Sequence, residues 1–254
     1  MSDATRRFDV RVEDYVRFRP SYPDAALDAL VARAGLSAGD VVVDVGSGTG
    51  ILTAQLLDRG LVVYAVEPNG PMRQAAEHLL GGRDGFHSVD ARAAHTGLPD
   101  ACARLVVAAQ AFHWFDREGV DAEFRRLLTD DGWLALLWNS HVTDDGTFTA
   151  DYEDVLVTFG QAYKRVTTSD SIEAELAAFY RDPSMARSTW PNPTTYDWET
   201  AFGRARSSSY APLPQAPEFG DFERALREAF ETYQRDGTVT FDYTTALYLG
   251  RLGA

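Results

Sequence analysis

The chain has 254 residues, of which 45% are hydrophobic and 12% aromatic, enough apolar material for one large α/β domain. Its formal net charge of −14 disfavours a nucleic-acid partner, because polyanions bind basic surfaces. The single cysteine, Cys102, allows no intrachain disulfide and fits a reducing compartment. No apolar run approaches the roughly 20 residues that cross a bilayer, and the first ten residues lack the apolar stretch of a signal peptide. We therefore expect a cytoplasmic protein with neither a membrane nor a nucleic-acid partner.

The first half of the chain alternates apolar strands with helical patterns. Strands are expected at 41–45, 61–66, 86–89, 105–109 and 133–138, and continuous apolar runs of this kind are typical of strands buried on both faces. Helical spacing of apolar residues lies between them, over about 23–35, 52–57, 71–82 and 120–128. This order predicts a Rossmann-like α/β fold: a seven-stranded, mostly parallel sheet with helices on both faces.

After residue 139 the pattern changes. Two amphipathic stretches near 155–159 and 172–179 predict helices with no strand between them, and a strand near 188–196, a helix over 218–234 and a strand over 238–249 follow. We expect a single domain over 1–254. Its parts would be an N-terminal cap segment (1–35), a cofactor-binding core (36–138), a helical lid inserted after the fifth strand (139–187), and closing strands and a helix (188–254).

The strongest functional signal is the segment 41–50, Val-Val-Val-Asp-Val-Gly-Ser-Gly-Thr-Gly. A buried strand runs into a glycine turn, and Gly46 and Gly48 allow backbone to approach a ligand without an intervening Cβ. Glu67 ends the next strand, where an acidic group can accept hydrogen bonds from both ribose hydroxyls of a nucleoside. The sequence therefore predicts a nucleoside-containing ligand at the carboxyl ends of these strands.

The glycine spacing distinguishes between classes of nucleoside cofactor. Nicotinamide and flavin enzymes carry G-x-G-x-x-G/A, whereas here the third glycine is Gly50 and the position for a small residue holds Ile51. Asp44, just before the loop, is poorly placed for a pyrophosphate and suits a ligand with an ammonium and a sulfonium. A nicotinamide-dependent oxidoreductase stays the alternative at this point.

Four stretches carry a resemblance to a known family. They are residues 15–23 (Tyr-Val-Arg-Phe-Arg-Pro-Ser-Tyr-Pro), the loop 44–50, Val66-Glu67-Pro68, and residues 109–116 (Ala-Gln-Ala-Phe-His-Trp-Phe-Asp). The sequence resembles class I S-adenosylmethionine-dependent methyltransferases over its whole length. It is most similar to the branch that includes trans-aconitate methyltransferases. The resemblance implies S-adenosylmethionine as the cofactor.

The resemblance also implies a role for each cofactor-binding residue. Asp44 would lie near the cofactor's amino group, Glu67 would hold the ribose hydroxyls, and Arg19 would pair with the carboxylate. The other implied cofactor residues are Gly46, Ser47, Gly48 and Thr49 along the methionine and ribose, Pro68, Met72, Asp90 and Ala91 around adenine, Gln110 and Ala111 beside the sulfonium, and Tyr15 over the cofactor. Tyr15 and Arg19 have an alternative interpretation, in which they pack the N-terminus on the core. Residues 15–23 are hypothesised to form a strap that orders when cofactor binds.

Histidines are the remaining candidates for chemistry. His113 follows the fourth strand, where loops face the ligand, and we expect it to contact substrate or to act as a base; the alternative is a buried imidazole bonded to backbone. His141 is expected to be an exposed loop residue. No spacing among the histidines indicates a metal site. The sequence predicts methyl transfer to a small-molecule acceptor (a carboxylate, hydroxyl or activated carbon) by a monomer or homodimer, or else a non-catalytic, methyltransferase-like binding protein.

Overall fold

A computed structural model describes residues 17–160, 170–208 and 211–253. Its large sheet has seven strands in the order β3-β2-β1-β4-β5-β9-β6. Strands β1 to β5 pair in parallel, and β9 is antiparallel to both of its neighbours. The strands are β1 (Val41–Val45), β2 (Val62–Val66), β3 (Phe86–Val89), β4 (Ala103–Ala109), β5 (Leu128–His141), β6 (Ala186–Pro191) and β9 (Tyr243–Gly250). The predicted Rossmann-like sheet is confirmed.

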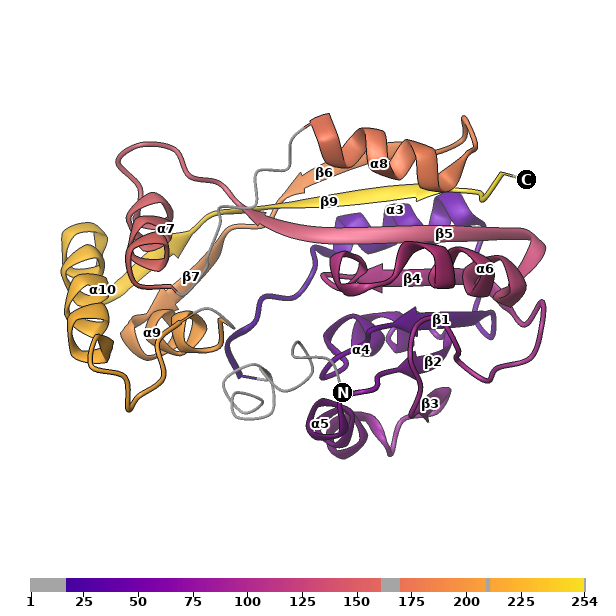
Figure 1. The fold of residues 1–254 in the computed structure, drawn as a ribbon, viewed down its shortest axis with the longest axis horizontal. Coiled ribbons are helices and arrows are strands. Elements are labelled where there is room, and N and C mark those ends of the chain that lie inside the picture. The colour runs from indigo at the N-terminus through magenta and orange to yellow at the C-terminus, as the bar shows by residue number, and fades with distance from the viewer. Residues whose placement is uncertain (1–16, 161–169, 209–210, 254) are drawn as a thin grey trace.

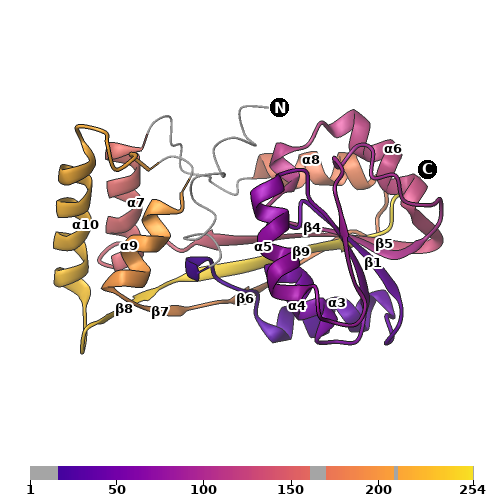
Figure 2. The same cartoon turned by 90° about the horizontal axis from the view of Figure 1, so that it is seen from below.

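Helices cover both faces of this sheet, as predicted. On one face α3 (Asp24–Ala34) and α4 (Ile51–Leu57) bury their leucines against alternate strand residues such as Val42 and Val63. On the other face α6 (Arg117–Leu127) and α8 (Asp170–Tyr180) pack on the intervening residues, among them Val43. Helix α5 (Gly70–Leu80) lies beside α4 (Figure 2). The two apolar clusters exist because successive strand side chains point to opposite faces.

A third apolar cluster forms a separate layer where β5 ends (Figure 1). We call it the outer cluster. It consists of α7 (Phe148–Phe159), α9 (Trp198–Arg206), α10 (Phe219–Tyr233) and the two-stranded sheet of β7 (Thr194–Asp197) and β8 (Thr238–Phe241). Buried aromatic rings fill it, including Phe222 and Phe241. Helix α7 is thus the inserted helical element after the fifth strand.

The second half of the chain differs from the expectation in three places. Helix α8 packs on the large sheet, where Leu176 and Tyr180 are buried in its apolar cluster, whereas α7 belongs to the outer cluster. Each of the two expected late strands is divided: 188–196 into β6 and β7, and 238–249 into β8 and β9. The division arises because β6 and β9 belong to the large sheet, whereas β7 and β8 form the two-stranded sheet. Helix α9 was not predicted, and the division of the domain at residues 35, 138 and 187 stays a prediction.

Candidate functional site

The glycine loop follows β1 at the centre of the sheet. Gly46 and Gly48 have φ angles of 71° and 58°, which non-glycine residues rarely adopt. A Cβ on Gly46 would lie 2.6 Å from the Cβ of Ala111, whereas a Cβ on Gly48 would meet nothing closer than the Met72 sulfur at 3.9 Å. Gly46 is therefore required for close approach to the segment after β4, and Gly48 for its backbone conformation.

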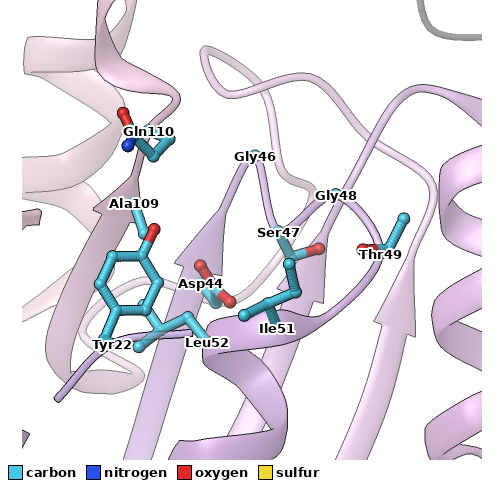
Figure 3. Close-up of a pocket in the computed structure, with 10 residues that line it drawn as sticks. All are labelled: Tyr22, Asp44, Gly46, Ser47, Gly48, Thr49, Ile51, Leu52, Ala109 and Gln110. Atoms are coloured by element: carbon cyan, nitrogen blue, oxygen red, sulfur yellow. The ribbon is translucent and has the colours of Figure 1, made fainter. Parts of the chain in front are cut away.

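A pocket opens beside this loop, between the carboxyl ends of β1 and β4 (Figure 3). Figure 3 shows the Asp44 carboxylate between the Tyr22 ring and the loop. Six of the sequence-predicted cofactor residues line the pocket together with four others: Asp44, Gly46, Ser47, Gly48, Thr49 and Gln110, with Tyr22, Ile51, Leu52 and Ala109. This is the position at which open α/β sheets bind ligands.

Asp44 is the central ionisable group of the pocket. It is 1% exposed, and one carboxylate oxygen accepts a hydrogen bond of 2.6 Å from the Thr53 hydroxyl. Burial raises the pKa of Asp44 to about 7, against the opposing effect of the Thr53 bond. The other oxygen, Oδ1, is buried and has no hydrogen-bond partner among the described residues, and the same holds for Ser47 Oγ and Thr49 Oγ1. Buried polar atoms without partners are rare, so these three fit a ligand that supplies donors and acceptors.

Glu67 stabilises the loop from behind. Its Oε2 accepts a hydrogen bond of 2.9 Å from the Gly48 N–H, and its Oε1 accepts one of 2.7 Å from the Asn69 N–H. Burial raises the pKa of Glu67, and the two backbone bonds partly offset the rise. Glu67 does not belong to the pocket lining. Each of its oxygens retains a lone pair, so it could still accept bonds from a ligand that extends past Gly48.

The segment after β4 forms the opposite wall. Gln110 has a φ of 54°, an unusual conformation that is typical of functional sites, and its Nε2 donates to the Asn139 carbonyl at 2.8 Å. Ala111 is 7% exposed and lies against the glycine loop. These two residues therefore lie where the sequence places them, at the carboxyl end of β4 beside the pocket.

His113 lies one turn further, in a short 3-10 helix (Phe112–Trp114). It is exposed, and its ring lies 4.9 Å from that of Trp114. Partial desolvation lowers the pKa of His113 to about 4, and the Arg117 charge adds to this effect. The imidazole is therefore neutral at pH 7 and able to accept a proton, but it is absent from the pocket lining. Its role as a base stays a prediction.

The expected adenine residues lie just beyond the carboxyl ends of β2 and β3 and in α5. Met72 is buried 3.9 Å from the Cβ position of Gly48, while Pro68 is exposed and Ala91 is half-buried. The exposed Asp90 carboxylate pairs with Arg73 at 2.8 Å, and Arg73 also donates to the Glu67 carbonyl. The arginine thus ties the ends of β2 and β3 together.

The N-terminal segment does not bring Arg19 to the pocket lining. The Arg19 guanidinium donates to the Ser207 carbonyl at 3.0 Å, just after α9. The neighbouring Phe18 is buried against Gly203 of that helix. Tyr15 lies outside the described residues. Residues 18 and 19 therefore contact the outer cluster, and the strap hypothesis stays a prediction.

His141 departs from its expected exposed position, because β5 extends three residues beyond its predicted end. It is half-buried, with its side chain 15% exposed, among the rings of Tyr152, Phe241 and Tyr243. Its Nδ1 bonds to the Glu153 carboxylate, and burial lowers the pKa of His141 while Glu153 opposes the change. In the described ranges, no group of three or more metal-binding side chains gathers, and no helix is long and apolar enough to cross a membrane.

The sequence-predicted set did not include the apolar lining residues Ile51, Leu52 and Ala109, nor two residues with polar side chains, Tyr22 and Thr53. Tyr22 lies in the stretch 15–23 that was singled out, yet only Tyr15 and Arg19 were chosen from it. Thr53 is detectable in principle, since a hydroxyl one turn into the helix after the loop faces back towards the end of β1. Its signal is weak because threonine at such a position is also a common packing residue.

Comparison with known proteins finds a methyltransferase domain in the first half of the chain. Residues 43–136 match the family model of the methyltransferase domain. An uncharacterized methyltransferase of Mycobacterium bovis is 36% identical over 138 residues, which are 54% of each chain. An uncharacterized methyltransferase-like protein of Schizosaccharomyces pombe is 30% identical over 141 residues, covering 53% of this chain and 52% of the relative. The chain thus spans about half the length of the curated relatives it matches.

Solved structures are similar over most of the chain. A proposed type II methyltransferase of Anaeromyxobacter dehalogenans has a TM-score of 0.61 at 22% identity, covering 92% of this chain and 98% of its own. A proposed methyltransferase from an antibiotic biosynthesis pathway of Anabaena variabilis has a TM-score of 0.61 at 20% identity, with 89% and 97% covered. At sequence identities of 20–22%, this structural similarity establishes the fold of the chain alone.

Proposed function

We propose that this chain, whose residues 43–136 match the methyltransferase domain, is a class I S-adenosylmethionine-dependent methyltransferase that binds S-adenosylmethionine and transfers its methyl group to a small-molecule acceptor. The observation that carries the proposal is the unpartnered Oδ1 of Asp44. A carboxylate buried at the end of β1 with one oxygen unused is suited to a cationic ammonium. It would repel a pyrophosphate, which disfavours the nicotinamide alternative.

The pocket residues are assigned parts of the cofactor by their chemistry. Asp44 would accept a hydrogen bond from the amino group, and the Ser47 and Thr49 hydroxyls would bond to polar atoms along the methionine and ribose. Glu67 would use its remaining lone pairs for ribose hydroxyls that lie beyond Gly48. Met72, with Pro68, would contact the apolar faces of adenine.

The cofactor supplies an electrophilic methyl group on a sulfonium. The task of the chain is to hold the acceptor in line with that group, because orientation can contribute up to roughly 7–11 kcal/mol to barrier reduction. Gln110, with its backbone fixed by a 2.9 Å bond from its N–H to the Leu137 carbonyl, lies at the end of the pocket from which an acceptor would approach. A hydroxyl or acidic C–H acceptor needs a base, and neutral His113 is the candidate; a carboxylate acceptor needs none.

Isothermal titration calorimetry with S-adenosylhomocysteine and with NAD tests the cofactor. We expect the former to bind and the latter not to. The reverse result would support an oxidoreductase. Transfer of a radiolabelled methyl group from S-adenosylmethionine to a panel of carboxylate, hydroxyl and carbon acceptors then tests catalysis. Cofactor binding with no transfer to any acceptor would favour a non-catalytic binding protein.

A further inference from the structure

The backbone of Ser21 and Tyr22 is held by side-chain amides. The Tyr22 N–H donates to Gln55 Oε1 at 3.1 Å, and Gln55 Nε2 donates back to the Tyr22 carbonyl at 2.7 Å. The Ser21 carbonyl accepts hydrogen bonds from Asn139 Nδ2 at 3.1 Å and from Asn192 Nδ2 at 2.9 Å. The flanking residues 20 and 23 are prolines, which have no N–H to offer a strand. Side chains therefore supply the bonds that a neighbouring strand would otherwise make.

The three amides come from separate parts of the fold. Gln55 lies in α4, Asn139 near the end of β5, and Asn192 between β6 and β7. We call Gln55, Asn139 and Asn192 the amide clamp. Three elements that are distant in sequence converge on two consecutive residues, which is more than general packing of an N-terminal segment requires.

Asn139 also connects the clamp to the opposite wall of the pocket. Its carbonyl accepts the bond from Gln110 Nε2 at 2.8 Å, while its side-chain Oδ1 accepts one from the Thr245 hydroxyl at 2.5 Å. The same residue therefore fixes Gln110 through its backbone and the Ser21–Tyr22 backbone through its side chain. Both Gln110 and Tyr22 line the pocket (Figure 3).

We propose that Gln55, Asn139 and Asn192 are positioning residues, which hold Tyr22 as a fixed wall of the cofactor pocket and thereby set cofactor affinity. The inference rests on the proposed function, since the pocket's ligand is taken to be S-adenosylmethionine. Tyr22 is 7% exposed and lies across from Asp44. A wall that is already in place binds ligand without the entropic cost of ordering it. A purely structural role for the amides predicts a loss of stability with no specific effect on binding.

A double-mutant cycle tests the proposal. The dissociation constant for S-adenosylhomocysteine is measured by calorimetry for the wild type, Gln55→Ala, Tyr22→Ala and the double variant, with melting temperatures recorded alongside. We expect Gln55→Ala to weaken binding by at least fivefold in the wild-type background and by less than twofold when Tyr22 is already alanine. Asn192→Ala removes a more exposed hydrogen bond than Gln55→Ala does, and it is measured in the same two backgrounds. We expect the same loss of affinity with Tyr22 present and the same small effect when Tyr22 is alanine. Gln74→Ala, on the exposed side of α5, is the matched amide control and should leave the affinity unchanged.

Two results would overturn the proposal. One is a lower melting temperature for Gln55→Ala and Asn192→Ala with affinities within twofold of the wild type. The other is an equal loss of affinity in both Tyr22 backgrounds, because the amides would then act independently of Tyr22. Failure of the wild-type chain to bind S-adenosylhomocysteine at all is a different outcome: it contradicts the proposed function itself and removes the inference with it.

Discussion

The pocket beside the glycine loop and the outer cluster both bury charged side chains, but these side chains differ in how many hydrogen-bond partners they have. In the outer cluster Glu153 bonds to one nitrogen of His141, the other nitrogen lies 3.4 Å from the Arg204 guanidinium, and Arg204 donates to the Tyr243 hydroxyl at 3.1 Å. In the pocket, Asp44 has a single hydrogen bond and an unused oxygen. The first arrangement connects α7, α9, β5 and β9, whereas the second leaves a buried charge available to a ligand. The partnered charges would be costly to separate, and the unpartnered carboxylate oxygen is the feature on which the proposed binding site rests.

The largest expected loss of stability comes from a variant that breaks the hydrogen bonds of the outer cluster. Glu153→Ala removes the carboxylate that bonds to His141 and leaves the buried Arg204 guanidinium, 3.4 Å from the other ring nitrogen, without that anion behind the ring. We therefore expect the free energy of unfolding to fall by about 3–5 kcal/mol in urea denaturation. Glu231→Ala, which removes an exposed carboxylate 3.8 Å from Arg227, is the control and should cost at most about 1 kcal/mol. Equal small losses for both variants would show that the buried bonds do not hold the outer cluster together.

Substitutions in the glycine loop should cause the next largest loss of stability. Gly46→Ala and Gly48→Ala both place a side chain at positive φ, and both should lose about 1–2 kcal/mol of stability for that reason. Gly46→Ala should lose about 1–3 kcal/mol more, because its Cβ would overlap the Ala111 side chain. Urea denaturation of the two variants measures the difference. If Gly48→Ala is the less stable variant, the loop and the segment after β4 are not as closely packed as described.

Glu67 could affect cofactor binding in two ways, by supporting the glycine loop or by bonding to the ligand itself. Its carboxylate bonds to the Gly48 N–H, so Glu67→Ala should weaken S-adenosylhomocysteine binding by about 1.5–3 kcal/mol. A 2′,3′-dideoxy analogue separates the two causes. If Glu67 bonds to the ribose hydroxyls, the analogue should bind the variant and the wild type about equally. If it acts only by supporting the loop, the variant should lose the same affinity for both ligands.

Six sequence-predicted residues line the pocket, and five of them are close along the chain. Residues 44–49 run from the end of β1 into the glycine loop, and apolar periodicity alone locates the strand that positions this loop. Tyr22 was missed because its place in the pocket depends on the bonds that hold the Ser21–Tyr22 backbone. Gln55 bonds to Tyr22, and Asn139 and Asn192 bond to Ser21; only the folded chain brings these residues together. Arg19 is a related case: the family resemblance implied a carboxylate partner for its guanidinium, whereas in the structure the guanidinium donates to the backbone carbonyl of Ser207, beyond α9.

The outer cluster was not predictable for the same reason. Its buried polar residues are separated by up to a hundred positions, and short strands such as β7 and β8 resemble parts of longer neighbours. His141 looks like a loop residue if β5 ends at 138, and only the pairing of β5 with β9 as far as Tyr243 carries it into the interior. The helix α8 was recognised as amphipathic, but periodicity does not say which apolar surface a helix covers.

The central claim, that Asp44 holds the cofactor's ammonium, predicts a specific pH dependence. Burial raises the pKa of Asp44 to about 7, so about one tenth of the carboxyl is ionised at pH 6 and about nine tenths at pH 8. An ammonium binds the ionised form. Affinity for S-adenosylhomocysteine should therefore rise about tenfold between pH 6 and pH 8. His113, with a pKa lowered to about 4, does not change charge in this range.

Calorimetric titration of the wild type and of Asp44→Asn with S-adenosylhomocysteine at pH 6 and pH 8 is the most direct test. We predict the tenfold rise for the wild type, and for Asp44→Asn a weaker affinity that is the same at both pH values. A wild-type affinity that does not change with pH, or a rise that persists in Asp44→Asn, would show that Asp44 is not the group that binds the cofactor's ammonium.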